Sequence, residues 1–141
     1  MPEENNEHSW QPHLSLDVPL MDSDHQKMVS LLGEVYAACK RHQWDDAVKD
    51  AMFDLSLFTV QHFNREEDLM RQVDYPGLRF HEKAHQKLIK ILDAISIRIA
   101  QDHAAAIDDQ TLDYLFKWLI KHVKRSDHQL AKFIHAKSTD S

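Results

Sequence analysis

Hydrophobic residues recur every three or four positions in four long stretches of this chain, and this periodicity limits the fold more than any other feature of the sequence. Such spacing is typical of amphipathic helices. Only two glycines occur, and three of the four prolines precede residue 20. A chain with so few turn residues has little room for a many-stranded sheet, so we expect an all-α protein.

Short polar segments separate the four predicted helices, and connections of this length make consecutive helices antiparallel neighbours. The helices are expected at about 22–41, at 46–72, at 76–101 and from residue 108 or 109 onward. We therefore predict an antiparallel up-down four-helix bundle at 21–137, with an irregular N-terminal lead-in at 1–20 and a polar tail at 138–141. Trp10 and Leu14 of the lead-in are available to pack onto the bundle as a lid.

Three of the predicted helices carry a recognisable start signal. Ser23, followed three residues later by Gln26, fits a capping box for the first helix. Asp45 is a suitable N-cap for the second helix. Pro76 suits the first position of the third helix, because its fixed φ is already helical and its missing N–H is not needed there.

Composition excludes several classes of function. The formal net charge of −6 argues against nucleic acid or an anionic membrane as partner, since both need basic patches. Cys39 is the only cysteine, which fits a reducing compartment. No hydrophobic run approaches the roughly 20 residues that span a bilayer, and Glu3, Glu4 and Glu7 do not suit a signal peptide. We expect a soluble, cytoplasmic protein.

Eleven histidines occur in the sequence, and five of them fall on faces predicted to point inward. Each hydrophobic stripe can be continued in steps of three and four residues, the spacing of one helix face. The continued stripes bring histidines from all four helices, and one glutamate, to the axis of the bundle. These residues are His25, His62, Glu66, His81, His85 and His122.

Six buried polar groups need partners. Burying one without a partner costs about 1–3 kcal/mol, so six would cost on the order of 10 kcal/mol, comparable to the stability of a whole domain. A metal ion removes this cost, because imidazole and carboxylate are preferred ligands of iron and related ions. A histidine-rich core held only by hydrogen bonds is the alternative, and it explains six such groups poorly.

The segments around these positions resemble the hemerythrin family, and within it the prokaryotic bacteriohemerythrins. The matching segments are MDSDHQKM, QHFNREEDLM, HEKAH and WLIKHVKRSD. They are similar to the family's helix-A histidine and to its H-x-x-x-E, H-x-x-x-H and H-x-x-x-x-D motifs, and they occur in the family's order. The resemblance extends from about residue 10, where Trp10 matches an N-terminal tryptophan, to residue 134.

The resemblance implies a centre of two iron ions, Fe2+ or Fe3+, bridged by oxide or hydroxide. It adds Asp127 as a seventh ligand, which periodicity does not select because residue i+5 lies about 140° around an ideal helix from residue i. Glu66 and Asp127 would bridge the two ions. One ion would be held by His81, His85 and His122, and the other, which keeps an open position, by His25 and His62.

The resemblance further implies that dioxygen binds reversibly at the open position and that the protein is not an enzyme. We expect oxygen carriage, storage or delivery. The alternative is an oxygen- or redox-sensing domain of a larger signalling protein, with a fused or separate signalling module as partner. Whether the reading frame ends after Ser141 discriminates between the two. By analogy with the family, the oxygen pocket is hydrophobic and consists of Met28, Phe63, Trp118, Leu119 and Val123.

The remaining polar residues near these motifs are expected at the surface. Glu67 and Asp68, next to Glu66, should face solvent. The other six histidines match no ligand of the family and should also be surface residues: His8, His13, His42, His103, His128 and His135.

Two other functions fit parts of the pattern. HEKAH formally matches the H-E-x-x-H motif of zinc proteases, but Glu82 should point away from the metal-facing side of a bundle helix. The sequence also shows no convincing strand for a substrate cleft. A ferritin-like di-iron oxidase should be rich in carboxylates, whereas this chain offers five histidines and two carboxylates.

Overall fold

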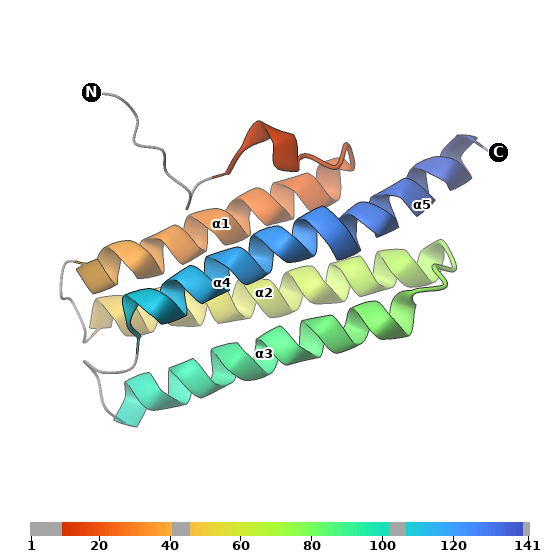
Figure 1. Ribbon diagram of the computed structural model, residues 1–141. Coiled ribbons are helices and arrows are strands. Elements are labelled where there is room, and N and C mark those ends of the chain that lie inside the picture. The colour runs from red at the N-terminus through yellow and green to blue at the C-terminus, as the bar shows by residue number, and fades with distance from the viewer. Residues whose placement is uncertain (1–9, 41–45, 102–106, 140–141) are drawn as a thin grey trace.

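The computed structural model describes residues 10–40, 46–101 and 107–139. These residues form the predicted all-α, antiparallel bundle, in which four long rods lie side by side (Figure 1). The last rod is continuous through α4, a π-helical turn and α5. The elements are a 3-10 helix η1 (Pro12–Leu14), α1 (Pro19–Lys40), α2 (Asp46–Gln72), α3 (Leu78–Gln101), α4 (Asp109–His122), the π-helical turn (Val123–Asp127) and α5 (His128–Thr139).

The hydrophobic stripes meet in the interior, where α2 packs against α1 and α3, and α1 packs against α4. Most of the buried hydrophobic residues form one large cluster, which includes Val35, Val48 and Leu112. A smaller cluster around Met21, Met70 and Leu130 fills the other end of the bundle. Every predicted ligand lies along the chain between residues of these two clusters, so the site is enclosed by hydrophobic packing at both ends.

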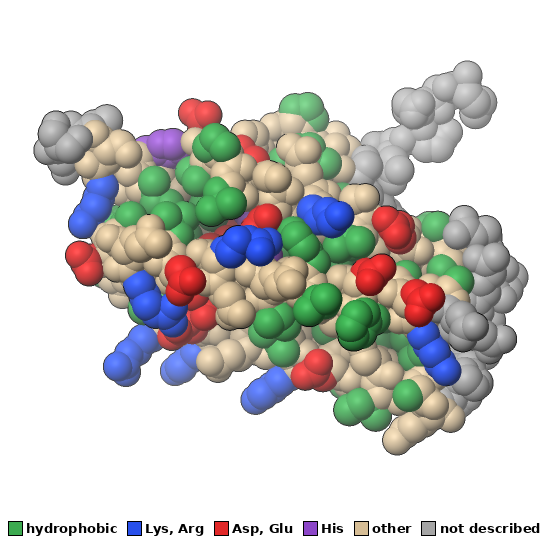
Figure 2. Space-filling model, turned by 180° about the vertical axis from the view of Figure 1, so that it is seen from behind, with side chains coloured by type: hydrophobic (Ala, Val, Ile, Leu, Met, Phe, Trp, Pro, Cys, Tyr) green, Lys and Arg blue, Asp and Glu red, His purple; other side chains and the backbone are tan. Residues whose placement is uncertain are grey.

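The outer faces of the helices carry charged groups of both signs interspersed with hydrophobic ones, as Figure 2 shows from behind. Within the described residues, no helix is long and hydrophobic enough to cross a membrane.

The first helix starts earlier than its predicted capping box. Pro19 is the first residue of α1, so Ser23 and Gln26 lie inside the helix and do not cap it. Asp22 instead anchors the lead-in, because its carboxylate accepts hydrogen bonds from the Leu16 N–H (2.8 Å) and from the Ser15 hydroxyl (2.7 Å). The expected N-cap Asp45 lies outside the described residues.

The third helix begins at Leu78, so the prediction that it opens at Pro76 is wrong. Pro76 instead follows the stop signal of α2. The N–H of Tyr75 donates to the Met70 carbonyl and that of Asp74 to the Arg71 carbonyl, the two hydrogen bonds of a Schellman motif. Asp74 has φ 55°, the left-handed conformation that this motif requires at its turning residue.

The described part of the lead-in packs onto the bundle as predicted. Leu14 is buried in the large cluster and Trp10 is half-buried against it. The Trp10 ring lies 6.5 Å from the ring of His25, measured between centroids. A ring nitrogen of His135, in α5, lies 3.1 Å from the Leu16 carbonyl oxygen and also holds this segment in place. The lead-in therefore covers the side of the site where His25 lies.

Candidate metal centre

Seven polar side chains converge in the interior of the bundle, and all are buried. They comprise the six that periodicity selects and Asp127, which only the family resemblance adds. Their candidate ligand atoms form two groups, and within each group all atoms lie within 4.8 Å of one another. One group contains three histidines and the other two, and both contain the same two carboxylates. The groups are Glu66, His81, His85, His122 and Asp127, and His25, His62, Glu66 and Asp127.

The carboxylate of Glu66 faces both groups of histidines. Its Oε1 lies 2.9 Å from Nε2 of His81 and 3.0 Å from Nε2 of His85. Its Oε2 lies 3.2 Å from Nε2 of His62 and 3.8 Å from Nε2 of His25. One oxygen is thus available to each group.

The two carboxylate oxygens of Asp127 are divided between the histidine groups in the same way. Its Oδ1 lies 2.9 Å from Nε2 of His81 and 3.2 Å from Nε2 of His122, while its Oδ2 lies 3.0 Å from Nε2 of His25. Each of the two carboxylates thus presents one oxygen to one group and its other oxygen to the other group, which is the arrangement needed to bridge a pair of metal ions.

The π-helical turn explains how Asp127 reaches the site. In a regular α-helix a residue five positions after His122 would lie about 140° away from it. Here the backbone N–H of His128 donates to the carbonyl of Val123, five residues earlier, which is the hydrogen bond of a π-helix. The wider turn rotates Asp127 onto the face that carries His122. Single π turns of this kind occur often at functional sites.

Seven polar atoms of the site are buried without a conventional hydrogen-bond partner among the described residues. Although imidazole nitrogens and carboxylate oxygens lie about 3 Å apart, many make no aligned hydrogen bond to any described residue. These atoms are both oxygens of Glu66, both oxygens of Asp127, both ring nitrogens of His25 and Nε2 of His85. Buried polar atoms almost always have a partner, so donor atoms that converge without bonding to each other suit a metal ion that they share. The residues present therefore fit a pair of metal ions.

Mutual attraction dominates the electrostatics of the metal-free site. Burial by itself lowers the pKa of His25, but the carboxylates of Asp127 and Glu66 outweigh burial and raise it to about 10. The pKa of His81 likewise rises to about 9. Burial would raise the pKa of Glu66, but the surrounding imidazoles of four histidines hold it well below its usual range. The carboxylates are therefore ionised, as a metal ligand must be.

Two residues outside the predicted set orient the ligands. Nδ1 of His62 lies 2.9 Å from the Asp24 carboxylate, which also accepts a hydrogen bond from Nε of Arg65 at 2.9 Å. Nδ1 of His85 lies 2.8 Å from the Glu67 carboxylate. A carboxylate on the outer nitrogen favours the tautomer whose Nε2 lone pair points inward, as metal binding requires.

The prediction that Glu67 faces solvent is therefore wrong. Its side chain is only 17% exposed, because α2 turns it towards α3 and His85. Asp68 is exposed, as predicted. No sequence signal marks Asp24, since its partner His62 lies 38 residues away.

The five predicted pocket residues all lie close to the site. The rings of Phe63 and His85 are stacked, with centroids 3.7 Å apart and planes 5° apart. The rings of Trp118 and His122 are also nearly parallel, 4.7 Å apart. Met28, Leu119 and Val123 are buried in the large hydrophobic cluster, whereas Trp118 is half-buried.

A narrow cavity of about 20 Å³ lies one helical turn from the site. Each helix supplies a lining residue three positions from a histidine of the site, for example Met28 from His25 and Leu119 from His122. Cavities of roughly this volume hold one small molecule. The lining is Met28, Leu32, Leu55, Thr59, Leu88, Leu92, Leu115 and Leu119.

Other candidate residues lie away from the site. The carboxylate of Glu82 pairs with Arg71 at 3.0 Å on the molecular surface and belongs to neither ligand group. His13, His128 and His135 are exposed, as predicted. His8, His42 and His103 lie outside the described residues.

Bundle and site together define a class of protein: a four-helix bundle whose core carries a cluster of metal-ligating side chains from facing helices. Comparison with known proteins identifies the family. The hemerythrin HHE cation binding domain matches residues 16–134, and the chain therefore belongs to the hemerythrin family.

Individual relatives match most of the chain. A bacteriohemerythrin of Stenotrophomonas maltophilia is 26% identical over 127 residues, which cover 90% of this chain and 81% of that protein. A myohemerythrin of Riftia pachyptila is 29% identical over 118 residues, which cover 84% and 86%. The crystal structure of a leucine-to-phenylalanine mutant matches with a TM-score of 0.79 at 16% identity, over 88% of this chain and 94% of that one, which supports the fold.

Proposed function

We propose that this chain binds two iron ions and uses them to bind dioxygen reversibly, for oxygen carriage, storage or delivery. The observation that carries the proposal is the division of Glu66 and Asp127 between three histidines on one side and two on the other. With a shared oxide or hydroxide bridge, the three-histidine ion would have six ligands and the two-histidine ion five. The open position would lie on the side of His25 and His62.

The donor set and the relatives support iron. Five imidazoles and two carboxylates suit non-haem iron, whereas ferritin-like oxidase sites are richer in carboxylates. The names of the relatives, bacteriohemerythrin and myohemerythrin, point to the same chemistry. A bound pair of ferrous ions would supply both the open position and the electrons that dioxygen needs.

The role of the surrounding residues is to hold the ligands and exclude water. Asp24 and Glu67 orient His62 and His85 from outside. The neighbouring cavity carries no ionisable group, and its one hydroxyl, that of Thr59, donates to the Leu55 carbonyl at 2.7 Å. A site without further acids or bases suits reversible binding. Proton donors would let the bound oxygen leave as peroxide instead of as dioxygen.

We also propose binding rather than catalysis. The general base that a zinc protease would require, Glu82, is held by Arg71 on the surface. Zinc in the purified protein together with peptidase activity would refute this view.

An optical spectrum through one cycle of anaerobic reduction and re-exposure to oxygen tests the proposal. We expect ferric absorption bands that bleach on reduction, and a new band that appears with oxygen and disappears under vacuum. Oxygen that yields only the ferric form would contradict reversible binding. Hydrogen exchange of α5 with and without oxygen separates carriage from sensing, because a sensor must change its helix packing.

A further inference from the structure

A strongly basic groove lies beside the proposed centre. It has a volume of about 460 Å³ and runs along the surface between α3 and α4. Its lining contains no carboxylate, although the chain as a whole has a formal net charge of −6. Its cationic side chains are Lys87, Lys117, Lys121 and Arg125.

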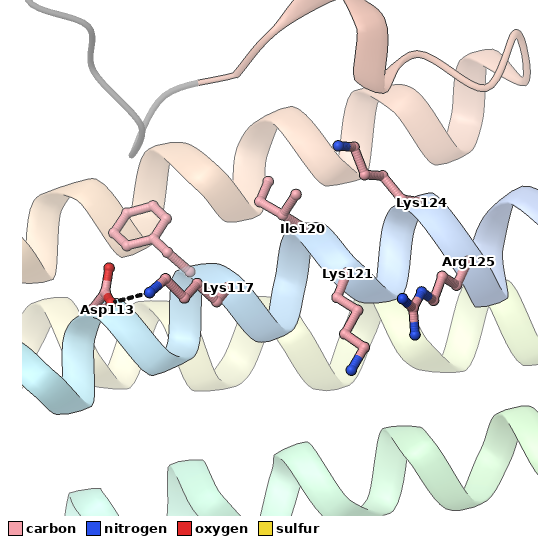
Figure 3. A pocket seen from close by; sticks show the side chains of 7 residues that line it. Asp113, Lys117, Ile120, Lys121, Lys124 and Arg125 are labelled. Atoms are coloured by element: carbon pink, nitrogen blue, oxygen red, sulfur yellow. Dashed lines mark ion pairs between the residues drawn. The ribbon is translucent and has the colours of Figure 1, made fainter.

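A second hollow of about 460 Å³ continues this surface along the outer side of α4. It adds Lys124, and Asp113 is its only carboxylate, paired with Lys117 at 2.8 Å. Lys121 and Arg125 extend towards α3, and Lys124 points towards α1 (Figure 3). We call the surface formed by Lys87, Lys117, Lys121, Lys124 and Arg125 the basic face.

The charges of the basic face are available to a partner. Apart from Lys117, its members make no ion pair with any of the described residues, and all of them are exposed. The opposite side of the molecule mixes acidic and basic side chains instead (Figure 2). A predominantly cationic surface on an anionic protein attracts and orients an anionic partner.

The floor of the groove leads directly to the centre. Half-buried Trp118 and the edge of His122 both line it, and their rings are stacked 4.7 Å apart. Nε2 of His122 lies 3.2 Å from Oδ1 of Asp127. Trp118 is therefore in direct ring contact with a proposed metal ligand, and an electron that enters there needs no further side chain to reach it.

We propose that the basic face is the docking site of an acidic one-electron donor protein that reduces the ferric centre. This inference rests on the proposed function, in which only the ferrous form takes up oxygen. Each donor molecule gives one electron, so two docking events convert two Fe3+ to two Fe2+ and leave two oxidised donors. Any proton taken up comes from solvent.

The shape of the surface favours a protein over a small anion. From Asp113 to Arg125 the rod rises by twelve residue steps, about 18 Å at 1.5 Å per residue. Both hollows are open to solvent along this length, and Tyr114, 47% exposed, flanks the groove. Electron-transfer partners form small, charge-steered contacts of this kind, typically below about 1,200 Å².

Charge reversal tests the proposal on the full-length, iron-loaded protein. The variant is Lys121→Glu with Arg125→Glu, and the matched control is Lys49→Glu with Lys132→Glu, which leaves the basic face unchanged. Reduced rubredoxin, a small acidic one-electron donor, is the probe. At low salt we expect the first variant to be reduced about tenfold more slowly than the parent and the control, and the difference to shrink as added salt screens the charges.

A binding measurement and a second reductant distinguish a loss of docking from damage to the iron centre. Oxidised rubredoxin, titrated calorimetrically, should bind the parent and the control about tenfold more tightly than the variant. Reduced methyl viologen, a small cation, should bleach the ferric bands of all three proteins without any slowing in the variant.

Three results would overturn the inference. Equal rubredoxin kinetics and affinity in all three proteins would show that the basic face does not dock the donor. Loss of binding to phosphatidylglycerol vesicles in the variant, with unchanged rubredoxin kinetics, would assign the face to a membrane. Absence of ferric bands from the parent would refute the proposed function and this inference with it.

Discussion

Removing the metal should strand the buried ligands and lower the melting temperature of the bundle strongly. Seven buried atoms of Glu66, Asp127, His25 and His85 make no hydrogen bond with the described residues. Once the histidines are neutral these atoms have no charged partner, and at about 1 kcal/mol each, the lower end of the cost of an unsatisfied buried group, they cost about 7 kcal/mol. For a chain of this length 1 kcal/mol corresponds to about 3 °C, so we expect a decrease of about 20 °C.

The size of this decrease should depend on pH. The carboxylates raise the pKa of His25 to about 10 and that of His81 to about 9 in the metal-free protein, against an ordinary value of 6.5. Protonated histidines therefore stabilise the metal-free fold fully below pH 6.5, and this stabilisation is lost as the pH rises through 9 and 10. Imidazoles that bind a metal are not protonated and do not contribute this stabilisation. The difference in melting temperature between the metal-loaded and the metal-free protein should therefore widen above neutral pH.

Thermal unfolding followed by circular dichroism at 222 nm measures both effects, with and without excess chelator, at pH 6, 7.5 and 9. His13→Ala, a change at an exposed histidine, is the control and should leave both forms unchanged. A metal-free protein that melts within about 5 °C of the loaded protein at pH 9 would refute the reasoning, because the stranded atoms would then have other partners.

Three further predictions concern single features of the site. Asp24→Ala should weaken binding of one metal ion about 10- to 100-fold in chelator competition. Asp24→Asn, which can still accept the His62 hydrogen bond, should lose less metal affinity. Equal affinities in the parent and both variants would exclude an orienting role for Asp24. Met28→Ala should enlarge the cavity and lower the free energy of unfolding by about 2–5 kcal/mol. The ferric bands should also grow faster in air, because the site is less shielded. An unchanged rate of oxidation would show that Met28 does not shield the site. Loading the metal-free protein with Fe2+ at pH 7 should release protons from His25, His62 and His81, whose pKa values are raised; calorimetric heats that do not vary with the buffer would contradict this.

Much of the site could be predicted from the sequence because its residues interrupt hydrophobic stripes. His25, His62 and Glu66 occupy helix positions that would otherwise hold core residues, so each is visible from its own helix alone. The same periodicity predicted the bundle. The predicted helix starts at Ser23 and Pro76 were wrong, because capping depends on contacts outside the helix, such as the hydrogen bonds between Asp22 and the lead-in.

Contacts between helices could not be predicted in this way. Asp24 and Glu67 look like solvent-facing neighbours of the ligands His25 and Glu66 in the sequence. Their partners, His62 and His85, lie on other helices, and only helix packing brings them within 2.9 and 2.8 Å. In the basic face, by contrast, four of the five cations lie three or four positions apart on the last rod, from Lys117 in α4 to Arg125 in the π-helical turn, and helix packing adds only Lys87 of α3.

Asp127 is the clearest example of a site residue whose position cannot be predicted from spacing along the sequence. Residue spacing was enough to predict that four amphipathic helices carry six polar side chains inward, because burial on one helix face depends only on spacing within that helix. The resemblance of the sequence to the hemerythrin family also identified Asp127 as the seventh ligand. Only the folded chain has the π-helical turn at Val123–Asp127 that rotates this carboxylate beside His122. Backbone geometry of this kind depends on the packing of the whole bundle, so spacing along one helix does not reveal it.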